Sequence, residues 1–219
     1  MVTDEQTEKL LAEAVNAYRQ LPKSIGVGVA IEAVTDRAVI ALSADEADKV
    51  LLDKICQAAR LVMERSLASP LRTGRLNELG NAVEEPLLNA CLEVGLEATW
   101  PKRQDGSGSR TGYPDIALGI SGNRPTYLEA KVIGAGSESS SFRSFYLSPS
   151  DNPKVCVDAR HLLVAFVHDR REDSDDGMEQ YSLTSFKVVD LSYVLGKIKF
   201  EYQSSNKDMY LGKAVIAKG

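Results

Sequence analysis

The stretch that decides the fold is Gly112-Tyr113-Pro114-Asp115-Ile116-Ala117-Leu118-Gly119-Ile120, followed after a short break by Thr126-Tyr127-Leu128-Glu129-Ala130-Lys131-Val132-Ile133. Each half is an apolar run of strand length. The residues between them, Ser121-Gly122-Asn123-Arg124-Pro125, are typical of a turn. Two strands joined by a turn predict a β-hairpin.

This hairpin is expected to gather three charged side chains at one end. Side chains alternate between the two faces of a strand, so Glu129 and Lys131 share one face while Ala130 takes the other. In an antiparallel pair, the start of the first strand lies near the end of the second. Asp115 opens the first strand, and we therefore expect it close to Glu129, although thirteen residues separate the two in the chain.

Two carboxylates and an amine in this arrangement suit phosphodiester chemistry. Mg²⁺ needs only one or two carboxylates, because waters and substrate phosphate complete its coordination. We expect Asp115 and Glu129 to bind Mg²⁺ and Lys131 to orient or deprotonate the attacking water. The alternative is a surface hairpin with a solvated Glu129 and Lys131, because the bare spacing arises about once by chance in a chain of this composition.

Pro114-Asp115, the thirteen-residue gap and Glu129-Ala130-Lys131 resemble the motif of the PD-(D/E)XK nuclease superfamily, with no position substituted. That superfamily includes type II restriction endonucleases, junction resolvases and repair nucleases. The resemblance is tight over 113–133 and looser over about 74–168. It implies a restriction-endonuclease-like α/β (α+β) core, with a central mixed sheet flanked by helices.

Two further segments are similar to parts of superfamily members. Many members carry a Gly-x-x-x-Glu helix before the metal-binding strands, and Glu84 after Gly80 matches it, which implies that Glu84 assists catalysis. The helix dipole explains an acid near a helix start equally well. The polar segment 139–161 is similar to one that enters a DNA groove in several restriction enzymes, although a polar loop over packed aromatics is the alternative. Its candidate DNA-contacting residues are Arg143, Tyr146, Asn152, Lys154 and Arg160.

Length and composition are ordinary for one globular domain. The chain has 219 residues, of which 43% are hydrophobic and 26% charged. We expect a single domain over 1–219, with the nuclease core at about 74–219 and a helical region at 1–73 that serves packing or dimerisation. A membrane span and a signal-peptide pattern are both missing, and the three cysteines are scattered, so a cytoplasmic protein with reduced thiols is expected.

The net charge of −5 hides an uneven distribution. Residues 102–171 carry ten bases and seven acids, a net charge of +3, whereas 1–101 and 172–219 carry −6 and −2. The positive balance falls on the segment that holds the hairpin. A locally basic cleft in an acidic exterior would bind phosphate, with strong salt dependence.

Periodicity predicts the remaining elements. Residues 24–34 are interpreted as a strand or, alternatively, as a loop-bounded helix, because Gly26 and Gly28 interrupt a β-branched run. A charged loop is expected at 169–179. We expect helices over 3–20, 45–67 and 77–92, strands near 98–100 and at 162–167, 186–190 and 197–202, and a helical turn at 191–195.

Other kinds of site find little support in the sequence. His161, His168 and Cys156 do not have the spacing of a tetrahedral zinc site, so we interpret both histidines as structural. The phosphate-binding and dinucleotide-binding glycine patterns are missing, as is the Gly-x-Ser-x-Gly turn of serine hydrolases.

The resemblance implies a Mg²⁺-dependent type II restriction endonuclease that cleaves double-stranded DNA at a short specific sequence, leaving a 5′-phosphate and a 3′-hydroxyl. It also implies a homodimer, with one site for each strand, and a cognate DNA methyltransferase by analogy. One alternative is a structure-selective repair or junction nuclease of the same superfamily. Others are a non-catalytic DNA-binding module and a protein with no nucleic-acid role.

Overall fold

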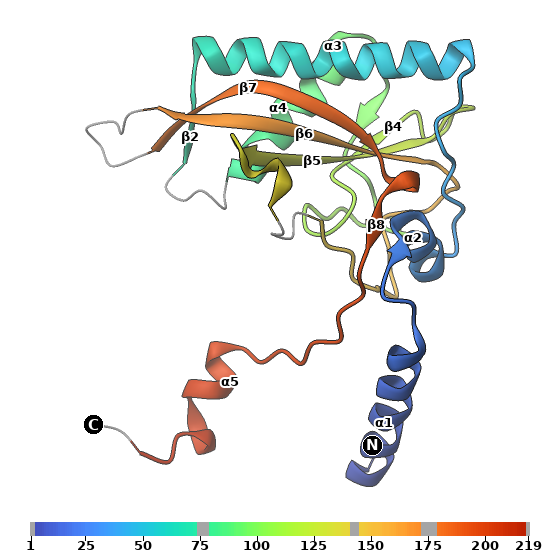
Figure 1. Cartoon of the computed structure of the whole chain (residues 1–219), viewed down its shortest axis with the longest axis vertical. Coiled ribbons are helices and arrows are strands. Elements are labelled where there is room, and N and C mark those ends of the chain that lie inside the picture. The colour runs from blue at the N-terminus through green and yellow to red at the C-terminus, as the bar shows by residue number, and fades with distance from the viewer. Residues whose placement is uncertain (1–2, 74–78, 141–144, 172–178, 218–219) are drawn as a thin grey trace. The chain divides into compact units, whose positions relative to one another are not determined.

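A computed structural model describes residues 3–73, 79–140, 145–171 and 179–217. The chain forms two compact units, one made of 26–194 and the other of its two ends, 1–25 and 195–219. The larger unit is built around a six-stranded sheet with helices packed against it (Figure 1). The predicted α/β class, with a central mixed sheet flanked by helices, is confirmed.

The strand order of this sheet is β2-β7-β6-β5-β4-β3. β5 and β6 run parallel and the other neighbouring pairs are antiparallel, which makes the sheet mixed. β5 lies inside the sheet, between β4 and β6. The strands are β2 (Leu71–Thr73), β3 (Ala98–Thr99), β4 (Ile116–Leu118), β5 (Thr126–Gly134), β6 (Arg160–Arg171) and β7 (Glu179–Asp190).

β6 and β7 have twelve residues each and are longer than the sequence predicts. The predicted strands at 162–167 and 186–190 are confirmed as parts of them. Tyr181 and Leu183, on either side of Ser182, are both buried, so the early part of β7 also packs into the interior. Of the predicted loop at 169–179, residues 172–178 lie outside the described residues, and 169–171 and 179 belong to the strands.

Three of the predicted helices are confirmed with small changes at their ends. They are α1 (Asp4–Gln20), α3 (Glu46–Ala68) and α4 (Leu79–Glu93). Each of the first two begins at a side-chain cap: the Thr3 hydroxyl accepts from the Gln6 amide, and the Asp45 carboxylate accepts from the Asp48 amide. Such caps satisfy backbone amides that have no partner within the helix.

The segment 24–34 is mainly helical, so the strand interpretation is wrong and the alternative is right. α2 (Val27–Thr35) buries Val27, Gly28 and Ile31, which share one helical face. A Cβ at Gly28 would lie 3.4 Å from Cγ1 of Val39 and 3.6 Å from the Ser192 backbone. These are ordinary van der Waals distances, so α2 packs against Val39 and Ser192 at Gly28. A glycine within a helix lowers its helix propensity, which explains why the sequence left the choice between strand and helix open.

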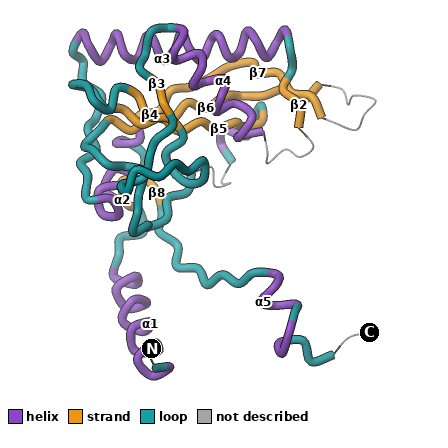
Figure 2. Tube along the Cα trace, turned by 180° about the vertical axis from the view of Figure 1, so that it is seen from behind, coloured by secondary structure: helices purple, strands orange, loops and turns teal. Residues whose placement is uncertain are grey.

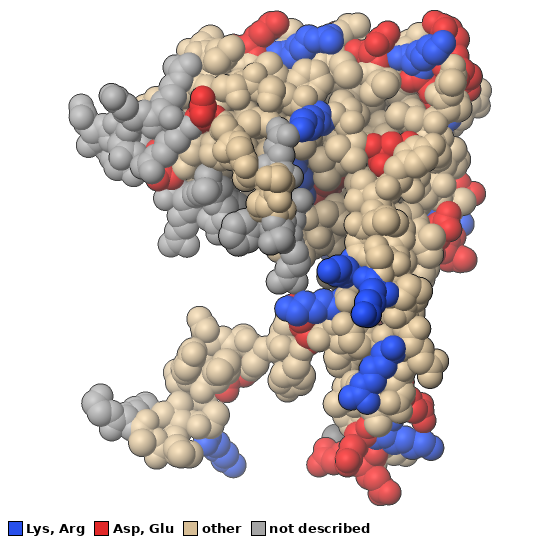
Figure 3. Space-filling model, in the orientation of Figure 1, with Lys and Arg blue, Asp and Glu red and all other residues tan. Residues whose placement is uncertain are grey.

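Different helices pack on the two faces of the sheet. α3 and α4 pack on the face formed by even-numbered residues of β5 and β6, such as Leu128, Leu162 and Val164. On the other face, Leu163 and Ala165 pack with Val27 and Ile31 of α2. Figures 1 and 2 show α3 along one side of the sheet and α2, with long loops, on the opposite side. Along α3, acidic and basic side chains are mixed (Figure 3).

A buried ionic network fixes the start of α3. Asp48 is 1% exposed and pairs with Nη1 of Arg124 at 2.6 Å and with Nε of Arg160 at 2.7 Å. It also accepts from the Ser43 amide at 2.8 Å. Although burial by itself raises the pKa of Asp48, the bonds from Ser43 and both arginines hold that pKa well below its usual range.

The smaller unit consists of α1 and the C-terminal segment with α5 (Asn206–Tyr210). Within it, the Tyr18 hydroxyl donates to the Ile198 carbonyl at 3.3 Å, and the Tyr18 ring lies 5.8 Å from that of Phe200. The predicted strand at 197–202 is wrong: extended pairing is confined to β8 (Leu195–Gly196), which pairs with β1 (Ile25–Gly26). The helical turn is η3 (Leu191–Tyr193), with η2 (Ser137–Ser139) and η4 (Gly212–Ala214) as further 3₁₀ turns.

No described helix combines the length and the apolar character that crossing a lipid bilayer demands.

Candidate active site

The predicted hairpin is present, as β4 and β5. Ile116 pairs with Leu128, so the same antiparallel register sets Asp115 opposite Glu129. The Asp115 amide donates to the Leu128 carbonyl at 3.1 Å, and the Ala130 amide donates to Oδ2 of Asp115 at 2.9 Å. The Asp115 side chain is thus held against β5, beside Glu129.

Glu129 is the most buried acid of this group, at 4% exposed. Its Oε1 accepts from the Lys131 ammonium, as expected for two residues on one face of a strand. Its Oε2 is buried and has no hydrogen-bond partner among the described residues. Burial raises the pKa of Glu129 to about 7, the charge of Asp115 adds to the rise, and Lys131 opposes it.

Glu84 reaches the same cluster from α4. Burial and the negative charge of Asp115 raise its pKa, and Arg110 and Lys131 act in the opposite direction. Nη2 of Arg110 donates to Oε2 of Glu84 at 3.2 Å, and its guanidinium lies 3.4 Å from the centre of the Trp100 ring. The sequence suggests for Arg110 only a place in a polar loop, 102–112, that either grips a DNA strand or is a plain surface loop. Its bond to Glu84 was not predicted, because only the fold brings the two residues together.

The donor set fits a hard divalent cation. Within the described ranges, no cluster of three His, Cys, Asp or Glu side chains is tight enough to ligate an ion by itself. Mg²⁺ does not require one, because it keeps several waters and uses one or two carboxylates with substrate phosphate. Asp115 and Glu129 supply two carboxylates, and the buried Oε2 of Glu129 is an oxygen available for such a bond.

A second lysine, Lys154, belongs to this cluster. It is 4% exposed, and burial lowers its pKa while Asp115, Glu129 and Glu84 oppose that change. The sequence predicts Lys154 as a DNA contact in the polar segment 139–161, and its side chain is buried close enough to the acids for their charges to affect its pKa. Its position depends on a long loop, which strand and helix periodicity do not describe.

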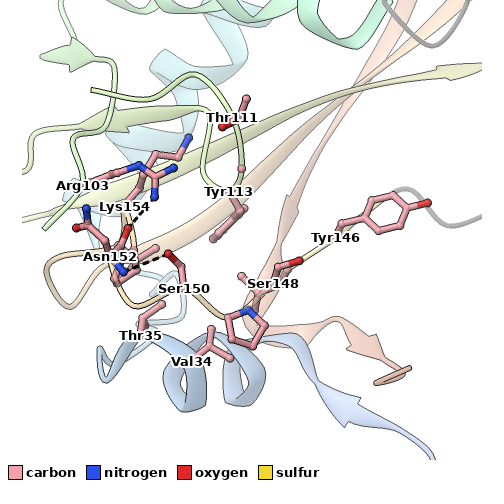
Figure 4. A pocket seen from close by; sticks show the side chains of 15 residues that line it. Val34, Thr35, Arg103, Thr111, Tyr113, Tyr146, Ser148, Ser150, Asn152 and Lys154 are labelled. Carbon is pink, nitrogen blue, oxygen red and sulfur yellow. Dashed lines mark hydrogen bonds between the residues drawn. The ribbon is translucent and has the colours of Figure 1, made fainter. Parts of the chain in front are cut away.

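A cleft of about 280 Å³ is lined in part by Lys154, and Glu84, Asp115 and Glu129 are not among its lining residues. In Figure 4, Lys154, Arg103 and Asn152 stand on one wall and Val34 and Thr35 of α2 lie beneath. Tyr113 and Tyr146 also line it. Two of the predicted DNA-contacting residues, Tyr146 and Asn152, therefore share this cleft with Lys154.

Arg160, another of the predicted DNA-contacting residues, does not line the cleft. Arg160 is 7% exposed and forms an ion pair with the buried Asp48. Its guanidinium is therefore not available to DNA, and we leave Arg160 out of the proposed DNA contacts. Arginine suits DNA and a buried ion pair equally well, and the sequence does not distinguish the two. Arg143 lies outside the described residues.

His161 lies in the interior beneath the acids. Its Nδ1 is 2.5 Å from the Tyr113 hydroxyl, and its ring also packs on Tyr127. Burial lowers the pKa of His161 to about 4. A fully buried, neutral histidine between two tyrosines fits the structural interpretation made from the sequence.

Comparison with known proteins decides the family. The family model of the type II restriction enzyme MjaV family matches residues 22–213, which include the whole larger unit. The chain belongs to the MjaV family. The type II restriction enzyme MjaV of Methanocaldococcus jannaschii is 32% identical over 184 residues, covering 77% of this chain and 77% of that protein. No solved structure matches the chain.

Membership of the MjaV family makes the protein a restriction endonuclease, and it therefore binds DNA. The predicted relation to type II restriction endonucleases is confirmed. Asp115, Glu129 and Lys131 all fall within the span that the family matches.

Proposed function

We propose that this MjaV-family protein is a Mg²⁺-dependent enzyme that hydrolyses both strands of duplex DNA at a short specific sequence, leaving a 5′-phosphate and a 3′-hydroxyl. The observation that carries the proposal is the β4–β5 register, which sets Asp115 opposite Glu129 with Lys131 next on the same face. The family supports the substrate class, and the donor set supports the metal.

Asp115 and Glu129 would hold the ion, and Glu84 would assist them. A bound Mg²⁺ polarises the phosphoryl oxygens and stabilises the developing charge on the leaving oxygen. Because Glu129 is buried, bulk water is kept away from its carboxylate. The lower local dielectric strengthens the interaction of this carboxylate with any cation. Glu84 is kept in place by Arg110, which itself stacks on Trp100.

Lys131 would orient the attacking water or accept its proton. Its side chain is 27% exposed, whereas that of Glu129 is 6% exposed, so Lys131 is the more solvent-accessible member of the pair. A base must lie within hydrogen-bond reach of the proton that it takes. Water can reach Lys131 through its exposed part.

Tyr146, Asn152 and Lys154 are the proposed DNA contacts at the cleft, and Arg143 is retained on sequence grounds. We also propose that the protein acts as a homodimer, because the two strands of a duplex are related by a two-fold axis and each copy has one acid cluster. A cognate methyltransferase that protects the host sequence is part of the proposal by analogy with restriction systems.

The alternatives are less well supported. A structure-selective repair or junction nuclease is not favoured, because the matching family is one of restriction enzymes. A non-catalytic DNA-binding module gives no reason to bury Glu129 with an oxygen that lacks a partner among the described residues. Such an acid is costly unless it is used.

The test is a digest of unmethylated phage DNA with Mg²⁺ and with a chelator. The wild-type protein is expected to give discrete, repeatable fragments only with Mg²⁺. Asp115→Asn is expected to lower the cleavage rate by more than about 100-fold. Asp53→Asn is the matched control, because Asp53 is an exposed acid of α3. Equal cleavage by the Asp115→Asn and wild-type proteins would overturn the proposal.

A further inference from the structure

The loop 102–112 reaches both the cleft and the acid cluster. Thr111 and Gly112 line the cleft (Figure 4), and Arg110, the residue before them, bonds to Glu84. The sequence allows this loop to grip a DNA strand or to be a plain surface loop, and the proposed function assigns it no part. Its two sets of contacts make it a candidate for a further DNA-binding element.

Hydrogen bonds hold this loop in place. The Arg103 guanidinium donates to the Asn152 carbonyl at 3.0 Å and to the Ser109 hydroxyl at 3.2 Å. The Thr111 amide donates to the same Ser109 hydroxyl at 3.3 Å. These bonds fix the backbone on both sides of Arg110 before any ligand arrives, which lowers the entropic cost of using Arg110 as a contact.

The guanidinium of Arg110 is itself held by two neighbours. It lies 3.4 Å from the centre of the Trp100 ring, and its Nη2 donates to Oε2 of Glu84 at 3.2 Å. Among the described residues, Glu84 is its one hydrogen-bond acceptor, whereas a guanidinium presents several N–H donors in a planar fork. The side chain is 52% exposed. Arg110 can therefore keep Glu84 and donate to a second anion from solvent.

The charge of the site gives such a donor a purpose. DNA that approaches the acid cluster meets three carboxylates, those of Glu84, Asp115 and Glu129, which repel its phosphates. A cation at the outer side of the cluster offsets this repulsion. Lys131 contacts Glu129, and its side chain is less exposed than that of Arg110. Of these two cations, Arg110 is the more accessible to a phosphate that arrives from solvent.

We propose that Arg110 binds a backbone phosphate of the DNA strand at the acid cluster while it keeps its bond to Glu84, and that stacking on Trp100 orients its guanidinium for both bonds. This inference rests on the proposed function and adds Arg110, from the loop 102–112, to the DNA contacts. An arginine suits this task, because its fork can donate to a carboxylate and to a phosphate at the same time.

The first test uses the wild-type protein, with phenylglyoxal to label its arginines and mass spectrometry to follow each site. Sheared phage DNA is added in a chelator, so that no strand is cut. At a DNA concentration about tenfold above Kd, labelling of Arg110 is expected to slow by about tenfold. Arg65 is the internal control, because it pairs with Glu93 and its side chain is 51% exposed, and its labelling should not change.

The second test removes the charge. In Arg110→Met, fluorescence anisotropy in the chelator is expected to show DNA binding about tenfold weaker, with a salt slope smaller by about one. Arg65→Met, which breaks an exposed arginine–glutamate pair at a distance from the cleft lining, should change neither quantity. If Arg110→Met does not fold, as judged by thermal melting, the labelling of the wild-type protein decides.

A third measurement separates a direct contact from an indirect one. Arg110→Met also leaves the charge of Glu84 unpaired, and this charge by itself repels DNA. The Glu84→Gln background removes that effect. The double variant Glu84→Gln/Arg110→Met is still expected to have a salt slope smaller by about one than Glu84→Gln alone.

The proposal is overturned if saturating DNA leaves the labelling of Arg110 unchanged, or if the double variant and Glu84→Gln have equal salt slopes. None of these measurements requires cleavage. A protein that shows the expected protection and slopes but never cuts DNA with Mg²⁺ contradicts the proposed function and supports the role of Arg110. A protein that cuts DNA but leaves Arg110 unprotected supports the proposed function and overturns the role of Arg110.

Discussion

At the scale of single residues, Glu129 carries the largest electrostatic cost in the site. Its side chain is 6% exposed, and its pKa of about 7 means that ionisation is disfavoured in the folded protein. The pKa of Glu129 in the unfolded chain is near 4.5. Below that pH, Glu129 is protonated in both states, and its contribution to the free energy of unfolding is at its most favourable. That stability is lost as the pH rises through about 7.

We therefore predict that Glu129→Gln melts at a higher temperature than the wild-type protein at pH 8 without metal, by about 3 °C or more. The difference should vanish near pH 4.5, where both side chains are neutral. Added Mg²⁺ should raise the melting temperature of the wild-type protein and leave that of Glu129→Gln unchanged. Differential scanning fluorimetry with and without Mg²⁺ measures both effects.

The control for this prediction is Glu46→Gln, because the Glu46 side chain is 84% exposed. It should follow the wild-type protein at every pH and in both metal conditions. A Glu129→Gln protein that is less stable at pH 8, or that gains as much from Mg²⁺ as the wild type, would contradict the prediction.

We predict that His161 makes the free energy of unfolding depend on pH in the direction opposite to that of Glu129. Because burial lowers its pKa to about 4, the unfolded chain binds a proton between pH 6.5 and 4 that the folded protein does not. Stability is thus lost as the pH falls through this window. In His161→Phe, the drop in unfolding free energy between pH 7 and pH 4.5 should be smaller than in the wild-type protein, as measured by urea denaturation. If the free energies of unfolding of His161→Phe and the wild-type protein fall in parallel with pH, this prediction is wrong.

The residues of the site differ in how far the sequence predicts them. Asp115, Glu129 and Lys131 lie on one hairpin, so strand alternation and a single turn are enough to bring them together. Arg110 and Lys154 reach the cluster through long loops, and their positions depend on contacts that no local pattern encodes. Arg160 was expected at DNA because a buried partner such as Asp48, more than a hundred residues away, is invisible in the sequence.

At the scale of elements, α3 depends on Asp48. This carboxylate joins the first turn of α3 to Arg124 before β5 and to Arg160 at the start of β6. Removing its charge leaves Arg160 buried without its partner, and a buried charge without its counter-ion is strongly unfavourable.

We predict that Asp48→Asn lowers the free energy of unfolding by about 3 kcal/mol. Lys49→Met, which breaks the exposed pair between Lys49 and Glu46, should change it by less than about 1 kcal/mol. Equilibrium denaturation in urea measures both. Equal, small effects of the two variants would show that the network does not stabilise α3.

Elements with a strong period were predicted well, and those shaped by packing were not. α1 and α3 have clear caps and regular apolar spacing. α2 was predicted ambiguously because its glycine and β-branched residues favour other structures. As a helix, α2 packs Val27 and Ile31 against Leu163 and Ala165 of β6. The strand expected at 197–202 has suitable residues but no neighbouring strand to pair with among the described residues.

At the scale of the whole molecule, the smaller unit contrasts with the larger one. No residue of α1 or α5 is buried. Large apolar side chains are exposed throughout this unit, among them Leu10, Leu11, Phe200 and Tyr210. A second copy packed against this unit would remove these side chains from water.

We predict that the proposed homodimer forms through this unit. The double variant Leu10→Lys/Leu11→Lys should elute as a monomer in size-exclusion chromatography with light scattering, and it should nick plasmid DNA more than it linearises it. Leu67→Lys, which changes an exposed leucine of α3 in the larger unit, should remain dimeric. A double variant that keeps the wild-type mass would contradict this interface.

The placement of Glu129 and Lys131 on β5 has a consequence for inactivation. β5 is paired with β6 along its whole length, whereas β4 pairs with it only at 126–128. Separating β5 from β6 would displace both side chains and dismantle the apolar layer beneath α3 and α4. Heat that opens the sheet of the larger unit is therefore expected to abolish activity, whereas melting confined to the smaller unit leaves these two side chains in place.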